Sequence, residues 1–212
     1  GDSTGNDPKL EITWHPPTEY IDGQCWYYCN STTNEKAAIV LFGGLAWSSS
    51  EVLVCSLYYH GYFVQDPWPH CKEKFILDLH ANGFNVLSPK NDSVSRPPPL
   101  EESSYYNGMQ DWVKNASMWL VEQGYQYIFL FGFSAGGVVA AYEIQKDYAT
   151  IFSAAVVADA PVDYDPYGSI YNSADTASKV KVCTSFIGGV NDIHPTFGNI
   201  TEQMKHYYDN TV

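Results

Sequence analysis

The fold of this chain is decided by the stretch Tyr127-Ile128-Phe129-Leu130-Phe131-Gly132-Phe133-Ser134-Ala135-Gly136-Gly137. Its first half is an apolar run too short for a helix, which predicts a buried β-strand. The small and apolar residues 135–141 predict a helix, so Ser134 is expected at a sharp turn between the two. Serine in such a turn takes a positive φ, which is strained for a residue with a Cβ. Gly132 and Gly136 are expected where strand and helix approach too closely for a side chain.

Residues 132–136 also have the G-x-S-x-G form of a nucleophile elbow, in which a serine hydroxyl stands above the edge of a sheet. With its flanking strand and helix, this segment resembles the elbow of esterase-type and lipase-type members of the α/β-hydrolase superfamily. The resemblance implies that Ser134 is a nucleophile that cleaves carboxylic esters through an acyl-enzyme. An ordinary turn between a strand and a helix in another α/β protein is the alternative.

Strands and helices alternate along the whole chain, which predicts an α/β fold with a mostly parallel sheet and helices on both faces. By length, residues 1–212 form a single domain. The first two predicted strands, an antiparallel pair, and the five that follow are residues 10–14, 24–29, 37–42, 84–88, 127–133, 154–158 and 181–187. The predicted helices are residues 48–58, 70–82, 104–123, 135 to about 147, and 200–208. This count matches the first seven strands of the α/β-hydrolase core, without the eighth.

The predicted strand at residues 37–42 ends in Gly43-Gly44-Leu45-Ala46. The glycine pair resembles the loop after the third strand of α/β-hydrolases, where a backbone amide contributes to the oxyanion hole. By this resemblance the amides of Leu45 and Ala135 are the two oxyanion donors. Preorganised donors of this kind stabilise the transition state of acyl transfer. A plain turn is the alternative.

The resemblance also implies an acid and then a histidine downstream of the serine. Asp192 is the first candidate for the acid, because residues 188–192 follow a predicted strand as the acid loop does in these enzymes. Asp159 is the second candidate, since some lipases carry the acid after the sixth strand. Each aspartate could instead form a turn or cap a helix.

The histidine of the expected site is harder to assign. His194 follows the correct strand, but it lies only two residues from Asp192 and is better placed to pair with Asp159 or Asp163. His206 is expected on the polar face of the last helix, exposed to solvent. Three explanations stay open: the protein continues past residue 212 and carries the histidine there, His194 serves in a shortened site, or the site is inactive.

Two functional hypotheses follow from these explanations. In the first, the chain is a serine hydrolase that acts on a small-molecule or glycan-linked ester. In the second, it is an inactive α/β-hydrolase-fold glycoprotein with a structural or binding role at the cell surface. In that case the aromatic-rich residues 57–68 would serve as an interface, and the chain could also associate with copies of itself.

Composition excludes several other classes of protein. The chain has 24 acidic and 11 basic side chains, a formal net charge of −13 at pH 7. Such a surface repels phosphate backbones and anionic lipids, so nucleic acid and membrane surfaces are not expected partners. No apolar run reaches the roughly 20 residues of a membrane span, and residues 1–9 do not resemble a signal sequence. No cofactor is expected, because neither a dinucleotide glycine pattern nor a metal-ligand spacing such as His-x-x-x-His occurs.

Sequons and cysteines predict an extracellular or cell-surface protein. Four N-glycosylation sequons begin at Asn30, Asn91, Asn115 and Asn199. Four of the five cysteines lie in the first third of the chain: Cys25, Cys29, Cys55 and Cys71. Two disulfides among them, with Cys183 free and buried, would suit an exported protein, although the sequence does not determine the pairing. A reduced cytosolic chain with unused sequons is the alternative.

Overall fold

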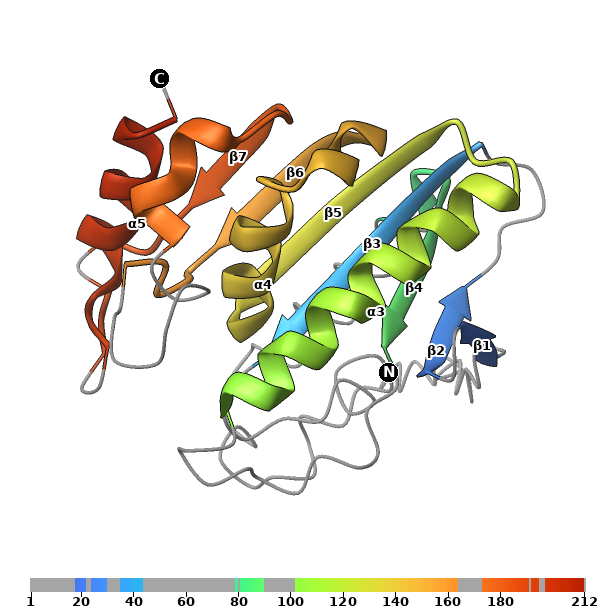
Figure 1. Cartoon of the computed structure of the whole chain (residues 1–212), viewed down its shortest axis with the longest axis horizontal. Helices are drawn as coiled ribbons and strands as arrows, with labels where there is room; N and C mark the ends of the chain where they lie inside the picture. The colour runs from blue at the N-terminus through green and yellow to red at the C-terminus, as the bar shows by residue number, and fades with distance from the viewer. Residues whose placement is uncertain are drawn as a thin grey trace, which may run out of the picture.

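The computed structural model describes residues 18–21, 24–29, 35–43, 79, 81–89, 102–163, 173–190, 192–194 and 197–211. A seven-stranded sheet in the order β1-β2-β4-β3-β5-β6-β7 runs through the described residues (Figure 1). Its strands are β1 (Thr18–Ile21), β2 (Gln24–Cys29), β3 (Lys36–Gly43), β4 (Phe84–Pro89), β5 (Tyr127–Ser134), β6 (Phe152–Ala158) and β7 (Thr184–Ile187).

Five adjacent strands of this sheet, β4, β3, β5, β6 and β7, pair in parallel, whereas β1 and β2 pair antiparallel. This confirms the predicted α/β fold with a mostly parallel sheet. Across the pairings, Gly43 lies beside Ser134, Phe133 beside Ala158, and Ala158 beside Ile187. The carboxyl ends of β3, β5, β6 and β7 are therefore level with one another, and this edge positions the candidate site.

The described helices form one layer on one face of the sheet (Figure 1). They are α3 (Glu102–Glu122), α4 (Ala135–Glu143) and α5 (Ile200–Asp209), with the 3-10 helices η2 (Asp147–Ile151) and η3 (Ser173–Lys179). α4 packs on β3, β5 and β6, and α5 packs beside α4, where the Tyr207 hydroxyl donates to the Ala141 carbonyl. The predicted helix at residues 48–58 and most of that at 70–82 lie outside the described residues.

The core lies between the central strands and this helical layer. β3 is buried along residues 37–41, on both alternating rows of its side chains, as is typical of a central strand in a parallel sheet. On α3, Val113, Ala116 and Leu120 are buried, while Lys114 and Met118 are exposed. This spacing of three and four residues is the apolar stripe that predicted the helix.

Some elements differ from their predicted positions. The antiparallel partner of β2 is β1 at Thr18–Ile21, and the strand predicted at residues 10–14 lies outside the described residues. α4 ends at Glu143, about four residues early, and the helix cannot continue through Lys146, which takes an extended ψ of 158° and caps η2. A two-stranded ribbon of β8 (Ile193–His194) and β9 (Gly198–Asn199) was not predicted.

Among the described helices, none combines the length and apolar character needed to cross a membrane.

Candidate active site

Ser134 ends β5 and caps the start of α4 with an unusual backbone. Its φ is 54° and its ψ is −121°, which confirms the positive φ predicted for the turn. Among the described residues, Asp159 is the other non-glycine residue with positive φ. Within the described part of the chain, neither a helix cap nor another hydrogen bond engages the Ser134 hydroxyl.

Three glycines make this turn sterically feasible. A Cβ at Gly132 would lie 2.2 Å from the Gly136 carbonyl oxygen, and one at Gly136 would lie 2.3 Å from the Leu41 carbonyl oxygen. Both contacts are with backbone, so neither can be relieved by a side-chain rotation. These distances confirm the close approach predicted at both positions. Gly137, which the sequence did not single out, is similarly confined, with a Cβ there 2.7 Å from the Ala160 Cβ.

The main-chain amides around Ser134 can stabilise an anion. Ala135 is the first residue of α4, and amides of a first helical turn have no acceptor within their own helix and carry the positive end of its dipole. Gly43 lies beside Ser134 in the β3–β5 register, so the segment that leads to Leu45 starts next to the serine. Leu45 itself lies outside the described residues, and its role stays a prediction.

The two candidate acids lie close together at this sheet edge. Asp159 directly follows β6 and has a φ of 43°, and its Oδ1 accepts a hydrogen bond of 2.8 Å from the Gly189 amide. Burial raises the pKa of Asp159 above its ordinary value; the hydrogen bond from Gly189 opposes this rise and the charge of Asp192 adds to it. Within the described residues no hydrogen bond reaches the Asp192 side chain, so its carboxylate can accept one from a catalytic base.

His194 lies in β8, two residues after Asp192, and is exposed. Its Nδ1 accepts a hydrogen bond of 3.3 Å from the Phe197 amide, and its ring lies against the Phe197 ring. The base of a serine hydrolase instead donates from Nδ1 to its acid. His194 therefore needs a different ring orientation to serve as that base.

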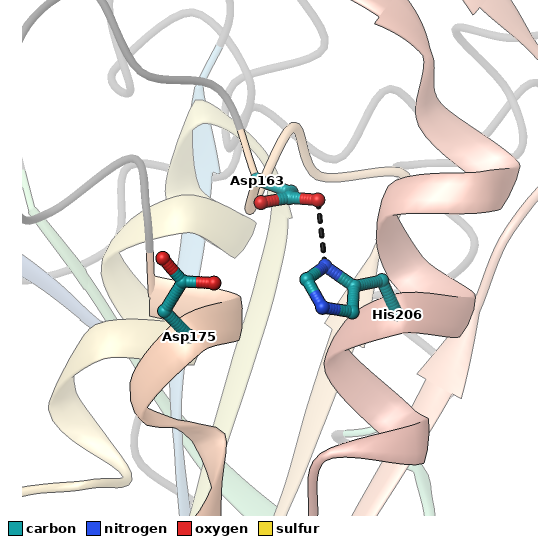
Figure 2. A group of neighbouring side chains, drawn as sticks. All are labelled: Asp163, Asp175 and His206. Atoms are coloured by element: carbon teal, nitrogen blue, oxygen red, sulfur yellow. Dashed lines mark hydrogen bonds and ion pairs between the residues drawn. The ribbon is translucent and has the colours of Figure 1, made fainter.

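His206 is bonded to Asp163. Its Nδ1 lies 2.6 Å from Asp163 Oδ2, the contact dashed in Figure 2. His206 was predicted to be a solvated surface residue, and its side chain is 43% exposed but has this carboxylate partner. Asp163 was predicted, with Asp159 as the alternative, to pair with His194, and it bonds to His206 instead. The pair forms because α5 packs beside the segment that follows β6, where Gln203 also accepts a hydrogen bond from the Asp163 amide. The other ring nitrogen of His206 lies 3.0 Å from Asn210 Nδ2, so it is not presented to a serine.

Asp163, His206 and Asp175 together have the donor types of a divalent-cation site (Figure 2). One ligand atom from each lies within 4.8 Å of the others. Residue spacing did not reveal this cluster, because its members come from the segment after β6, from η3 and from α5. Both ring nitrogens of His206 already lie within hydrogen-bonding distance of Asp163 and Asn210. An ion bound by His206 would therefore replace the contact of one ring nitrogen with Asp163 or with Asn210.

Three of the five cysteines, Cys25, Cys29 and Cys183, lie among the described residues. Cys25 and Cys29 both lie in β2, and four strand positions place their Cα atoms about 13 Å apart. A disulfide spans less than about 7 Å between Cα atoms, so these two cannot pair with each other. Cys55 and Cys71 lie outside the described residues. Cys183 is free, but it is exposed rather than buried as predicted, because it lies directly before the edge strand β7.

Two sequons lie among the described residues, and their glycosylation stays a prediction. Asn115 is half-buried in α3 rather than fully solvent-facing, and the Ser117 hydroxyl of its sequon is buried and donates to the Val113 carbonyl. Asn199 caps α5, where its Oδ1 accepts from the Glu202 amide. Asn30 and Asn91 lie outside the described residues.

The fold matches that of solved α/β-hydrolase structures at low sequence identity. TT1662 from Thermus thermophilus aligns with a TM-score of 0.63 and 14% identity, over 94% of this chain and 85% of that one. LpqC, a poly(3-hydroxybutyrate) depolymerase from Bordetella parapertussis, aligns with a TM-score of 0.60 and 16% identity, over 93% and 77%. An esterase from Pyrococcus furiosus, Pf2001, gives a TM-score of 0.59 and 14% identity over 93% and 77%. No protein-family model and no curated protein sequence matches the chain. At such identities the similarity establishes the fold alone.

Proposed function

We propose that this protein is a serine hydrolase that cleaves carboxylic esters through an acyl-enzyme at Ser134. The observation that carries the proposal is the backbone of Ser134, at φ 54° and ψ −121°, enclosed by glycines that have no space for a Cβ. Such strain costs about 1–3 kcal/mol and persists where the surrounding structure enforces it, as active sites do.

The proposed reaction has two halves. The Ser134 hydroxyl attacks the ester carbonyl while a base takes its proton, and the amides of Ala135 and Leu45 stabilise the resulting oxyanion. Collapse of this intermediate expels the alcohol, which receives the proton, and leaves Ser134 acylated. Water, activated by the same base, then releases the acid and restores the serine. Asp192 holds the base in the required tautomer and stabilises its cation.

The base in this proposal is His194 or a histidine outside the described residues. His194 is supported by its place just after β7, close in sequence to Asp192. It would need to turn its Nδ1 from the Phe197 amide toward Asp192. His206 is the weaker candidate, because Asn210 engages its second ring nitrogen.

The proposed substrate is a small-molecule or glycan-linked ester, and the proposed location is outside the cell or on its surface. The ester is supported by the esterase-like elbow and by the esterase and depolymerase named among the similar folds. The location is supported by the four sequons and the cluster of cysteines near the start of the chain.

The second candidate is an inactive α/β-hydrolase fold with a structural or binding role. It is favoured by the bonds of the two described histidines. The His194 Nδ1 accepts from the Phe197 amide, and the His206 ring, whose Nδ1 bonds to Asp163, has its other nitrogen 3.0 Å from Asn210 Nδ2. Exposed apolar side chains around β7 also suit a contact surface for another protein or copy: Ile187, Val190, Ile193 and Tyr208.

A fluorophosphonate probe separates the two candidates. An activated serine is expected to add one phosphonyl group per chain, seen by intact mass, and Ser134→Ala is expected to abolish the addition. His194→Gln and His206→Gln test the base, and the variant that slows labelling identifies it. A folded chain that takes up no probe would contradict the hydrolase and support the structural role.

A further inference from the structure

Two aspartates lie at the same sheet edge, but their hydrogen bonds differ. The Asp159 carboxylate accepts from the Gly189 amide at 2.8 Å, and the Asp159 amide donates to the Ile187 carbonyl at 2.8 Å. Asp159 therefore holds both the end of β7 and the segment just after it. The Asp192 carboxylate has no hydrogen bond among the described residues, although its main chain is fixed.

Thr201 holds the main chain of Asp192 and of Gly189. Its hydroxyl donates to the Gly189 carbonyl and accepts from the Asp192 amide at 3.2 Å. The Asp192 carbonyl in turn accepts from the Ile200 amide at 2.9 Å, at the start of α5. Gly189 is thus bonded to Asp159 through its amide and to Thr201 through its carbonyl, and it links Asp159 to the main chain of Asp192.

The backbone of Asp159 supports this role. A φ of 43° is rare for a residue with a Cβ, and aspartate and asparagine tolerate it better than most. Asp159 lies one position past the Ala158–Ile187 pairing, level with the start of the segment that it holds.

We infer that Asp159 is a positioning residue: its carboxylate holds the segment after β7 so that Asp192 can present its own carboxylate to the catalytic base. The inference rests on the proposed function. It separates the roles of the two candidate acids, because Asp192 contacts the base and Asp159 acts through Gly189.

Two substitutions at Asp159 separate a positioning role from that of the acid. Asp159→Asn keeps an oxygen for the Gly189 amide and tolerates the positive φ, but removes the charge. Asp159→Gly also accepts this φ, but removes the hydrogen-bond acceptor. Asp192→Asn is the comparison at the proposed acid. The measurements are the rate of labelling by the fluorophosphonate probe and the hydrogen-exchange rate of the Gly189 amide, both on the full chain after its folding is verified.

We expect Asp159→Gly to slow labelling by roughly 10-fold or more, because misplaced catalytic groups lose rate steeply. The Gly189 amide should exchange about 10-fold faster once its acceptor is removed. Asp159→Asn should recover most of both losses, and Asp192→Asn should abolish labelling without changing Gly189 exchange.

Two results would overturn the inference. In the first, the probe labels Asp159→Asn as slowly as Asp159→Gly, which would make the charge of Asp159 itself essential. In the second, the Gly189 amide of Asp159→Gly exchanges at the wild-type rate. A wild-type chain that takes up no probe would instead overturn the proposed function. In that case the exchange measurements still decide whether Asp159 holds this segment.

Discussion

At the scale of single residues, strain is concentrated at two neighbouring positions. Ser134 follows Phe133 and Asp159 follows Ala158, and these two residues pair between β5 and β6. The two positive-φ backbones therefore lie at the carboxyl ends of adjacent strands. Each such residue costs about 1–3 kcal/mol. The buried sheet beneath them compensates for this loss of folding free energy. Backbone strain of this kind is typical of active sites.

The strain at Ser134 predicts an unusual effect of glycine. At φ 54° and ψ −121° the backbone mirrors an extended conformation, which glycine adopts freely. Relief of the strain should outweigh the entropy that glycine adds to the unfolded chain, about 0.5–1 kcal/mol. We expect Ser134→Gly to be more stable than Ser134→Ala by about 1 kcal/mol, measured by urea unfolding, with both variants inactive toward the probe. A Ser134→Gly variant that is less stable than Ser134→Ala by the entropy cost of glycine, about 0.5–1 kcal/mol, would show that the turn stores no strain.

At the scale of elements, the junction between β5 and α4 depends on contact between backbones. Gly136 lets the first turn of α4 rest directly on β3, where a Cβ would lie 2.3 Å from the Leu41 oxygen and 2.9 Å from the Leu41 Cβ. β3 is fully buried at this point, so it cannot move aside without disturbing the core.

Gly136→Ala is therefore expected to destabilise the fold strongly, by about 3 kcal/mol or more. Gly124→Ala is the matched control: Gly124 has a φ of 87°, but no atom lies within 4 Å of a Cβ placed there. That variant should lose only about 1 kcal/mol, for the left-handed backbone alone. Urea unfolding of both variants gives the comparison, and similar losses would mean that α4 can shift away from β3 at little cost.

The same elements show what sequence could predict. β3 and β5 were predicted close to their observed bounds because they are short, largely apolar runs, and α3 because of its stripe. The ribbon of β8 and β9 was missed because two-residue strands have no periodicity. At the site, the Ser134 turn was predictable because its determinants are local. The bond of His206 to Asp163, and that of Gly189 to Asp159, join residues far apart in sequence, whose contact depends on how α5 and β7 pack.

At the scale of the whole molecule, acidic charge is the dominant property. The chain has a formal net charge of −13 and a sequence pI near 4.6. Local pairs do little to offset it: Lys181 with Asp147 and Lys205 with Asp209 are exposed ion pairs, and such pairs contribute little to stability. Self-repulsion among the remaining carboxylates therefore opposes the compact state at neutral pH.

Salt should consequently stabilise this protein. The screening length falls from about 30 Å near 0.01 M salt to about 10 Å near 0.1 M. At pH 7 we expect the free energy of unfolding to rise over this range by on the order of 1 kcal/mol, measured by urea unfolding in sodium chloride. The same titration near pH 4.6 is the control, because with little net charge to screen the rise should largely vanish. If salt stabilised the protein equally at both pH values, the effect would come from hydration of the surface or from a bound ion, and the acidic surface would not be what limits its stability.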